Sequence, residues 1–363
     1  MTTISNKKYI VLGIMSGTSL DGLDLAICSF SKNPDKWNWK LLASKTVLYS
    51  ADLRKKLEYA PSLSGQGIIE LDNEFGYFIG SQAKEFIDET GLQIGLICSH
   101  GHTVFHQPDK KLTFQAGSGA SIAAKTGKIT VSDFRSTDIS LGGQGAPLVP
   151  AGDEFLFSEY DYCLNLGGFA NISYRSANKR VAYDICPVNI VLNLLTQRIG
   201  MLYDKDGITG SSGNIDGGML KKLDQLGFYK DKAPKSLGRE WFENEFLPIV
   251  DKNDLPVADK IRTVYEHVAK QIAFIPDQNK TVLITGGGAH NKFLVDLIKK
   301  YCKAECIVPD DKTVDFKEAI IFAFLGLLRL RNEINCFASV TGASRDSCCG
   351  VISLGTDPDE IYR

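Results

Sequence analysis

The stretch that decides the fold is Tyr9-Ile-Val-Leu-Gly-Ile-Met-Ser-Gly-Thr-Ser-Leu-Asp-Gly-Leu-Asp24, near the start of the chain. Residues 9–15 are apolar and partly β-branched, which is typical of a buried strand, and residues 23–30 are apolar again. Residues 16–22, between them, are mostly Gly, Ser, Thr and Asp, which tolerate the backbone angles of a tight turn. The pattern predicts two strands joined by a turn whose N–H groups and hydroxyls suit phosphate oxygens.

Two carboxylates, Asp21 and Asp24, lie in and beside this turn. They would repel a phosphate unless a cation lay between them, and Mg²⁺ is the usual cation in such sites. The turn is not the strand–loop–helix phosphate motif, because no Gly-Lys-Ser or Gly-Lys-Thr follows it. Taken alone, the stretch also fits an ordinary tight hairpin, so the rest of the chain has to decide.

Composition narrows the class of protein. The 363 residues suggest two domains, and a net charge of −2 provides no basic surface for nucleic acid or membrane. The nine cysteines are scattered without CxxC pairs, which favours a reducing compartment over a disulfide framework. The first residues lack the pattern of a signal peptide, and the longest apolar run, residues 319–328, is too short to span a bilayer. We therefore expect a cytoplasmic protein.

Hydrophobic spacing predicts the same order of elements twice. In the first half, a third strand, two helices, a strand, a short helix and a strand are expected at residues 37–48, 51–58, 67–90, 93–99, 121–126 and 129–133. In the second half, three strands, a helix, a polar insertion, a helix, a strand and a helix are expected at residues 162–166, 170–174, 181–184, 188–200, 203–260, 264–274, 281–284 and 292–301. This alternation predicts α/β architecture with a mixed sheet in each half.

Three glycine-containing turns stand in the order found in the superfamily of sugar kinases, actin and heat-shock ATPases: Ser16–Gly22, Leu164-Asn-Leu-Gly-Gly-Phe-Ala-Asn171 and Thr285-Gly-Gly-Gly-Ala-His-Asn291. More narrowly, the chain resembles the anhydro-N-acetylmuramic acid kinases from about residue 9 to residue 355. Further motifs carry this resemblance: Asp133-Phe-Arg135, Leu141-Gly-Gly-Gln-Gly-Ala-Pro-Leu-Val-Pro150, Tyr203-Asp-Lys-Asp-Gly207, Ala233-Pro-Lys-Ser-Leu-Gly-Arg239 and Ser339-Val-Thr-Gly-Ala-Ser344.

The resemblance implies a fold and its boundaries. The fold is α/β, with two actin/hexokinase-like (ribonuclease H-like) domains facing a central cleft for nucleotide and sugar. We expect residues 1–155 to form the N-terminal domain and residues 156–337 the C-terminal domain. Residues from about 338 to 363 are expected to pack back on the first domain.

The resemblance also implies ATP and Mg²⁺ as cofactors. The first phosphate loop would comprise Gly17, Thr18, Ser19, Leu20, Asp21, Gly22, Leu23 and Asp24, with Asp21 toward the metal. The opposing hairpin would contribute Gly167, Gly168 and Asn171, where the missing side chains let backbone amides approach phosphate. The adenosine turn would contribute Gly286, Gly287, Gly288 and Asn291.

Asp184 is the expected catalytic base, because it ends a predicted strand where a carboxylate can reach a cleft. By resemblance it matches the aspartate that activates water in the family; the alternative is a carboxylate that caps the following helix. The family usually has Asp-Thr-Gly-Pro-Gly-Asn here, whereas this chain has Asp184-Ile-Cys-Pro-Val-Asn189. The change of Gly to Val188 excludes a strongly positive φ there and puts the local loop shape in doubt.

Five further residues are expected near the sugar: His102, Arg135, Gln144, Asn189 and Glu318. Three imidazoles within seven residues, at positions 100, 102 and 106, also fit a metal site, but the matching family stretch is not one. Two alternatives stay open: a structural salt bridge for Arg135, and for Glu318 a role only at the N-terminus of its own helix. Asp204 and Asp206 fit a solvated turn.

The resemblance implies one coupled reaction in peptidoglycan recycling. Water attacks the anomeric carbon of 1,6-anhydro-N-acetylmuramic acid, and O6 takes the γ-phosphate of ATP to give N-acetylmuramic acid 6-phosphate. Two alternatives stay open: a kinase of another sugar or anhydrosugar, and a nucleotide-dependent switch like actin or the heat-shock ATPases. The partners implied are the small amino sugar and ATP, with a possible homodimer.

Overall fold

The computed structural model describes residues 7–17, 20, 22–34, 36–252 and 254–355. The chain forms two compact units: Met1–Leu156 with Phe316–Arg363, and Phe157–Asp315. The sequence placed the return to the first unit near residue 338, whereas the structure places it at Phe316. The reason is helix α13 (Asp311–Leu330), most of which packs on the sheet of the first unit.

The first unit contains a mixed six-stranded sheet in the order β13-β7-β4-β1-β2-β3. Its strands are β1 (Lys8–Ser16), β2 (Gly22–Lys32), β3 (Trp37–Leu48), β4 (Leu96–Ser99), β7 (Thr130–Ser132) and β13 (Val351–Ser353). The first three strands are antiparallel neighbours, β4 is parallel to β1, and β7 is parallel to β4. The late strand β13 pairs antiparallel with β7, so residues 351–353 return to the first unit as expected.

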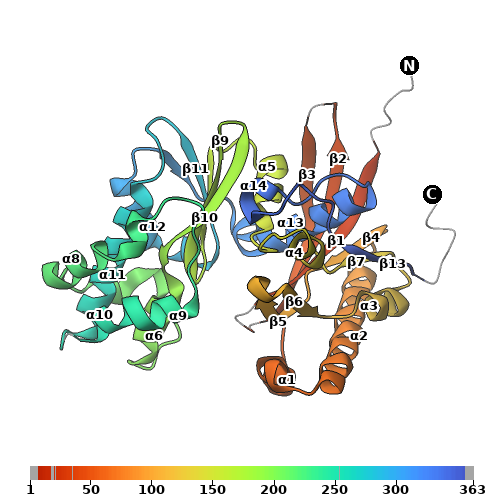
Figure 1. The fold of residues 1–363 in the computed structure, drawn as a ribbon, viewed down its shortest axis with the longest axis horizontal. Coiled ribbons are helices and arrows are strands. Elements are labelled where there is room, and N and C mark those ends of the chain that lie inside the picture. The colour runs from red at the N-terminus through yellow and green to blue at the C-terminus, as the bar shows by residue number, and fades with distance from the viewer. Residues whose placement is uncertain (1–6, 18–19, 21, 35, 253, 356–363) are drawn as a thin grey trace. The chain divides into compact units, whose positions relative to one another are not determined.

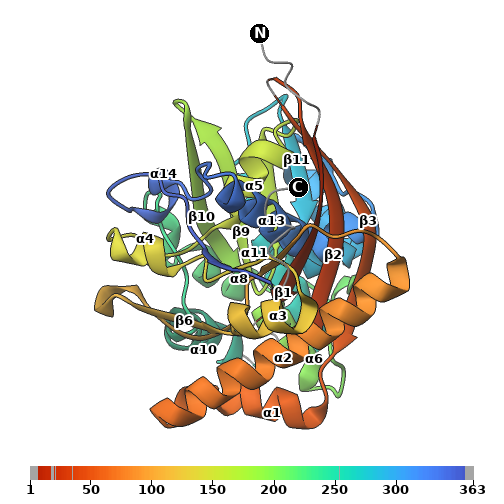
Figure 2. The ribbon, with the colours of Figure 1, turned by 90° about the vertical axis from the view of Figure 1, so that its right-hand side faces the viewer.

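Helices cover both faces of this sheet because its strands carry apolar residues on both faces. On one face, Leu12 and Ile14 of β1 share a core with α1 (Ala51–Tyr59), α2 (Gly65–Thr90) and α3 (Gly119–Thr126); Figure 2 shows α2 crossing in front of the strands. On the other face lies α13. A Cβ on Gly13 would come within 1.9 Å of the Ala319 carbonyl oxygen, so this glycine permits the close approach.

One feature of the first unit was not predicted. After β4 the chain forms a separate two-stranded hairpin, β5 (His102–Gln107) and β6 (Leu112–Ala116), which carries two of the three histidines. The remaining short elements of this unit are η1 (Ala60–Ser62), η2 (Pro108–Lys110), α4 (Ser136–Ser140), α5 (Val149–Leu156) and α14 (Ala338–Thr341).

The second unit contains a five-stranded sheet in the order β10-β9-β8-β11-β12. Its strands are β8 (Tyr162–Leu166), β9 (Phe169–Ser176), β10 (Lys179–Pro187), β11 (Thr281–Thr285) and β12 (Glu305–Ile307). Its main helices are α6 (Asn189–Gln197), α11 (Val257–Ala273) and α12 (Lys292–Tyr301) (Figure 1). The predicted insertion holds short helices: η3 (Lys205–Gly207), α7 (Ile208–Ser211), α8 (Gly217–Asp224), η4 (Gly227–Lys230), α9 (Arg239–Trp241), η5 (Phe242–Phe246) and α10 (Leu247–Asp251). The turn η6 (Gly287–His290) precedes α12.

The predicted duplication is confirmed at the level of topology. In each unit an antiparallel three-stranded meander is followed by two strands that run parallel to its first strand. The α/β class and the mixed sheet in each half are therefore correct. In the described part of the chain, no helix is long and apolar enough to cross a membrane.

Candidate functional site

The turn between β1 and β2 was the proposed first phosphate loop. Strand pairing continues to Met15 opposite Asp24 and Ser16 opposite Leu23, which is the last pair before the turn. Leu20 adopts a left-handed φ of 58° inside it. The Asp24 carboxylate accepts a hydrogen bond of 2.6 Å from the Thr46 hydroxyl. Thr18, Ser19 and Asp21 lie outside the described residues.

His102 lies at the base of this turn. Its Nδ1 is 3.5 Å from the Ser16 hydroxyl oxygen, which itself accepts a hydrogen bond of 2.8 Å from Tyr49. Burial lowers the pKa of His102, so the ring is neutral at pH 7. The structure shows a buried His102 side chain next to the end of β1, and its place near the sugar stays a prediction.

Arg135 forms its main contact with a histidine whose role was not predicted. The guanidinium donates to His100 Nε2 at 3.1 and 2.7 Å and to the Gly145 carbonyl at 2.6 Å. His100 Nε2 must therefore accept, and its Nδ1 donates to the Gly101 carbonyl at 2.8 Å. Burial and the Arg135 charge both hold the pKa of His100 well below its usual range. With both ring nitrogens of His100 engaged, the three histidines are not a metal site, and the described residues hold no metal-ligating cluster.

Gln144 lies in a loop shaped by a residue that sequence reasoning missed, Asp138. This fully buried carboxylate accepts hydrogen bonds from the Gly145 amide, the Thr341 hydroxyl and the Cys336 thiol. The Gln144 amide donates to the Thr341 carbonyl at 2.9 Å, and its side chain is exposed. The signal that could have identified Asp138 was its position just before the glycine-rich loop.

Glu318 lies well inside α13, because that helix begins at Asp311, so the alternative role at a helix N-terminus is wrong. Burial raises the pKa of the Glu318 carboxyl, and the charges of Arg135 and then Lys317 oppose this. Burial lowers the pKa of Arg135 to about 10, against the opposing effect of Glu318. The first unit therefore brings together Arg135, Glu318 and the Gln144 loop.

In the second unit, the turn Gly167-Gly168 joins β8 to β9 and rests on the start of α6. The Gly168 carbonyl accepts from the amides of Val188 and Ile190, and the Gly167 carbonyl accepts from the amide of Asn189. These carbonyls accept hydrogen bonds from amides at the start of α6, which have no partner within the helix. The Asn189 side chain donates to the Leu166 carbonyl at 3.0 Å, which braces the hairpin a second time.

Asp184 lies on β10, opposite Asn171 of β9, at a β-bulge between Asp184 and Cys186. Its Oδ2 accepts a hydrogen bond of 2.8 Å from the Leu237 amide. Burial raises the pKa of the Asp184 carboxyl, and the Leu237 hydrogen bond opposes that rise. Asp184 does not cap α6, whose N-cap is Val188 without a side-chain hydrogen bond.

The three positions that depart from the family pattern all belong to the core. Ile185, Cys186 and Val188 are 3%, 0% and 0% exposed, and all pack in the hydrophobic core of the second unit. The bulge allows Ile185 and Cys186 to enter the core although they are neighbours in a strand. Val188 has φ of −127°, so it needs no glycine. The substitutions therefore change core packing next to Asp184.

At the third glycine turn, two glycines are tightly constrained: Gly286, which precedes η6, and Gly288 within it. Gly286 has φ of +82°, and a Cβ there would lie 2.1 Å from Asn165 Oδ1. A Cβ on Gly288 would lie 2.7 Å from the Leu166 side chain. Asn291 caps α12 by accepting from the Leu294 amide, and its amide group donates to Tyr265. The side chain of Asn291 is thus engaged by the protein.

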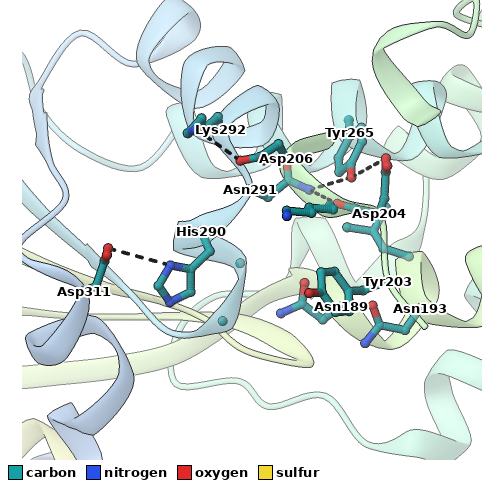
Figure 3. A pocket seen from close by; sticks show the side chains of 14 residues that line it. Asn189, Asn193, Tyr203, Asp204, Asp206, Tyr265, His290, Asn291, Lys292 and Asp311 are labelled. Atoms are coloured by element: carbon teal, nitrogen blue, oxygen red, sulfur yellow. Dashed lines mark hydrogen bonds and ion pairs between the residues drawn. The ribbon is translucent and has the colours of Figure 1, made fainter. Parts of the chain in front are cut away.

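A cavity of about 520 Å³ opens beside this turn. Asn189 lines it together with Gly287, Gly288, Asn291 and residues not predicted for the site: Leu192, Asn193, Tyr203, Asp204, Lys205, Asp206, Tyr265, His290, Lys292 and Asp311. Figure 3 shows Asn189, Asn193 and Tyr203 grouped on one side and His290 with Asp311 on the other. Its size and polar groups suit a ligand such as a nucleoside.

Asp204 was interpreted as part of a solvated turn, and this is wrong. It is 4% exposed and accepts hydrogen bonds from the amides of Thr209 and Gly210 and from the Tyr265 hydroxyl. Asp206 is partly buried with φ of 54° and pairs with Lys292 at 3.5 Å. Residues 203–206 of the motif Tyr203–Gly207 line the cavity. The signal in the sequence was that this motif belongs to the family resemblance.

A model of the anhydro-N-acetylmuramic acid kinase family matches residues 9–355. The chain belongs to this family. Anhydro-N-acetylmuramic acid kinases of two bacteria are 35% identical to it: that of Vibrio vulnificus, with 95% of this chain and 98% of the relative covered, and that of Synechococcus elongatus, with 95% and 100% covered. That of Francisella tularensis subsp. novicida is 34% identical, with 97% and 100% covered.

Among solved structures, the chain is similar to the activator of 2-hydroxyisocaproyl-CoA dehydratase from Clostridium difficile with bound ADPNP. That similarity has a TM-score of 0.42 at 14% identity and covers 87% of this chain and 94% of the other. Nothing about function follows at this level of similarity, whereas the match to the anhydro-N-acetylmuramic acid kinase family extends over nearly the whole chain.

Proposed function

We propose that this chain is an ATP-dependent kinase that hydrolytically opens 1,6-anhydro-N-acetylmuramic acid and phosphorylates its O6, giving N-acetylmuramic acid 6-phosphate. Membership in the family supports the proposal. The single observation that carries it is the environment of Asp184. This half-buried carboxylate has one oxygen held by a backbone amide and a pKa raised by burial. A carboxylate in that state can act as a general base toward water.

The proposed reaction needs one acid–base residue. Asp184 takes a proton from water as the water oxygen bonds to the anomeric carbon and the bond from that carbon to O6 breaks. Ordinary glycoside hydrolysis uses a second carboxyl group to protonate the leaving oxygen. Here the electron pair on O6 forms a bond to the γ-phosphorus of ATP, and ADP leaves, so no second acid is required.

The second unit supplies a fitting place for the nucleoside part of ATP. The cavity beside η6 has the volume of a small-ligand site, and Gly287 and Gly288 expose backbone at its wall. We assign adenosine to this cavity and the phosphates to the hairpin at Gly167-Gly168. Asn189 joins the two, since it lines the cavity and donates to the Leu166 carbonyl at the hairpin.

Mg²⁺ is part of the proposal. It is usually held by one or two carboxylates together with the substrate phosphates, so a cluster of three protein ligands is not needed. Asp24, at the start of β2, offers such a carboxylate, and Asp21 is proposed beside it. When bound, the ion would neutralise developing charge on the transferred phosphoryl group.

In the first unit, we propose that Arg135, Glu318, Gln144 and His102 serve the sugar side of the reaction. Arg135 and Glu318 are partly buried and interact electrostatically, and Arg135 also donates to the Gly145 carbonyl of the Gln144 loop.

We also propose a reducing compartment such as the cytoplasm, because all nine cysteines are free thiols.

The reaction is tested by product analysis. Purified chain, ATP, Mg²⁺ and anhydro-N-acetylmuramic acid in ¹⁸O-water should yield ADP and a 6-phosphorylated sugar with the label at C1. ADP release without sugar would favour a nucleotide switch. Unlabelled or unphosphorylated product would contradict the coupled reaction.

As the pH is lowered, activity should be lost at a higher pH than it would be if the base were an aspartate with an ordinary pKa. The base must be ionised, and burial raises the pKa of Asp184 above its usual value of about 3.9. As pH falls through that raised pKa, Asp184 gains a proton and the rate is lost. Measuring kcat/KM for the sugar across acid and neutral pH checks this. A limb at or below the ordinary carboxyl range would contradict it.

Asn189→Ala should weaken the binding of ATP more than the binding of the sugar. The sequence assigned Asn189 to the sugar, but its side chain lines the cavity beside η6, where we propose adenosine, and donates to the Leu166 carbonyl. Loss of one hydrogen bond predicts a rise of about 2–10-fold in the KM for ATP. Steady-state kinetics with each substrate varied should show the KM for the sugar nearly unchanged. A larger effect on the sugar would restore the original assignment.

A further inference from the structure

Asp184 is held by a segment that is neither helix nor strand. Residues 231–238 have no regular secondary structure, yet two backbone hydrogen bonds join them to Asp184. The Asp184 amide donates to the Lys235 carbonyl at 3.1 Å, and the Leu237 amide donates to Asp184 Oδ2 at 2.8 Å. Something other than sheet pairing must therefore keep residues 235–237, here named the clamp, in place.

The side chain of Lys235 provides that anchor. Its Nζ donates to the Phe228 carbonyl at 2.8 Å and lies 4.3 Å from the centroid of the Phe228 ring. The ammonium thus makes a hydrogen bond and a cation–π contact with one residue. Burial lowers the pKa of Lys235, and Asp231 opposes this only in part. The Lys235 side chain therefore extends from the clamp to η4 and is partly buried there.

The element that receives Lys235 is itself fixed to the core. Phe228 is 8% exposed, and its ring lies 5.3 Å from that of Trp241. The next residue, Tyr229, donates its hydroxyl to His267 Nε2 at 2.8 Å, and His267 Nδ1 donates to Asp224 at 2.6 Å. Burial lowers the pKa of His267 against the effect of Asp224, so the neutral ring keeps this arrangement at pH 7. A continuous set of contacts therefore runs from α11 through η4 to the clamp.

We propose that Lys235 is a positioning residue for catalysis, which holds the clamp on η4 and thereby aims the Asp184 carboxylate at the attacking water. The inference rests on the proposed role of Asp184 as the base. With Oδ2 bound to the Leu237 amide, Oδ1 is the oxygen that takes the proton. A reacting group that moves by about 1 Å can lose about 100-fold in rate, so a distant anchor has a measurable effect.

Three variants test the inference. Lys235→Met keeps most of the aliphatic stem and removes the ammonium, Lys235→Arg keeps a cation and donors, and Lys232→Met removes an exposed lysine of the same segment. Lys235→Met should lower kcat by about 10–100-fold with the KM for ATP unchanged. Lys235→Arg should recover much of that loss, and Lys232→Met should match the wild type. Equal kcat in Lys235→Met and wild type would overturn the proposal.

The pH profile separates positioning from a general loss of structure. Weakening the Leu237 hydrogen bond removes a contact that favours the ionised carboxylate, so the acid limb of kcat/KM should move upward by up to about one pH unit. Near Asp184, the other titratable groups that the structure shows are Cys186 on its own strand and Lys235 on the clamp, with Tyr229 close to Cys186. Burial raises the pKa of both Cys186 and Tyr229, so neither titrates in acid. A lower kcat with an unmoved limb would contradict positioning.

One readout does not depend on turnover. In protein labelled with ¹³C at aspartate carboxyls, the Asp184 signal is identified by its absence in Asp184→Asn, and its pKa is then titrated. The pKa should be higher in Lys235→Met than in wild type or Lys232→Met. If the wild type shows no sugar-dependent turnover but this shift occurs, the proposed function fails and the positioning contact stands. If turnover is normal and the shift is absent, the positioning role fails alone.

Discussion

Replacing Asp184 with Asn should lower kcat for sugar-dependent ADP formation by about 10²–10⁴-fold, the range that general bases contribute. Asn preserves size, and its carbonyl oxygen can still accept the Leu237 amide. The change removes only the capacity to take a proton. Affinity for ATP should stay nearly the same, because Asp184 does not line the cavity beside η6. Kinetics with saturating sugar and calorimetry with ATP measure the two quantities.

A matched control for this variant is Asp296→Asn, which neutralises an exposed aspartate on α12. It should keep wild-type kinetics, so a loss confined to Asp184→Asn cannot come from the change in net charge. Turnover of Asp184→Asn close to that of the wild type would remove Asp184 as the base. Loss of ATP binding in the same variant would show that its role is structural.

After Asp184→Asn, the largest expected effect is that of Gly286→Ala, which should weaken ATP binding. Gly286 adopts φ of +82°, and a Cβ would lie 2.1 Å from Asn165 Oδ1 and 3.0 Å from backbone atoms of Leu166. An L residue there is strained by about 1–3 kcal/mol, so the turn must shift or the fold loses that stability. A shifted turn alters the wall of the cavity. We expect the KM for ATP to rise about 10-fold or more and Tm to fall.

The neighbouring glycine is the control. A Cβ on Gly287 would meet only Asn189 Nδ2, at 3.8 Å, and its φ is not in the left-handed region. Gly287→Ala should therefore keep its Tm and change the KM for ATP much less. If both variants bind ATP like the wild type, the cavity beside η6 is not the nucleotide site. If both lose binding equally, backbone strain at Gly286 is not the cause.

Local pattern was sufficient for most of the fold. Alternation and apolar runs predicted both meanders, because a strand buried on both faces leaves a short apolar stretch between turn residues. The same reasoning missed β5 and β6, whose sequence is mixed and rich in His and Thr. It also shortened α13 to its apolar centre, since the first turns of that helix are polar. The boundary between the units was misplaced because most of α13 packs on the sheet of the first unit.

For the site, residue types and motifs predicted which residues are candidates, but not which other residues each of them contacts. Arg135 and His100 are 35 positions apart, and their hydrogen bond depends on how two strands end at one edge of a sheet. The doubt raised by Ile185, Cys186 and Val188 could be resolved only from burial, because a single sequence does not reveal which side of a bulged strand a residue faces.

By itself, the sequence determined the α/β class, the repeated order of elements, the three glycine turns and the carboxylate at position 184. These depend on short-range preferences of the backbone and on motifs that are continuous in the chain. Only the tertiary structure decided that the clamp holds Asp184, that Asp138 shapes the Gln144 loop and that residues 203–206 line a cavity. Each of these joins groups far apart in the chain, and such contacts exist only when the packed cores bring their backbones within hydrogen-bond distance.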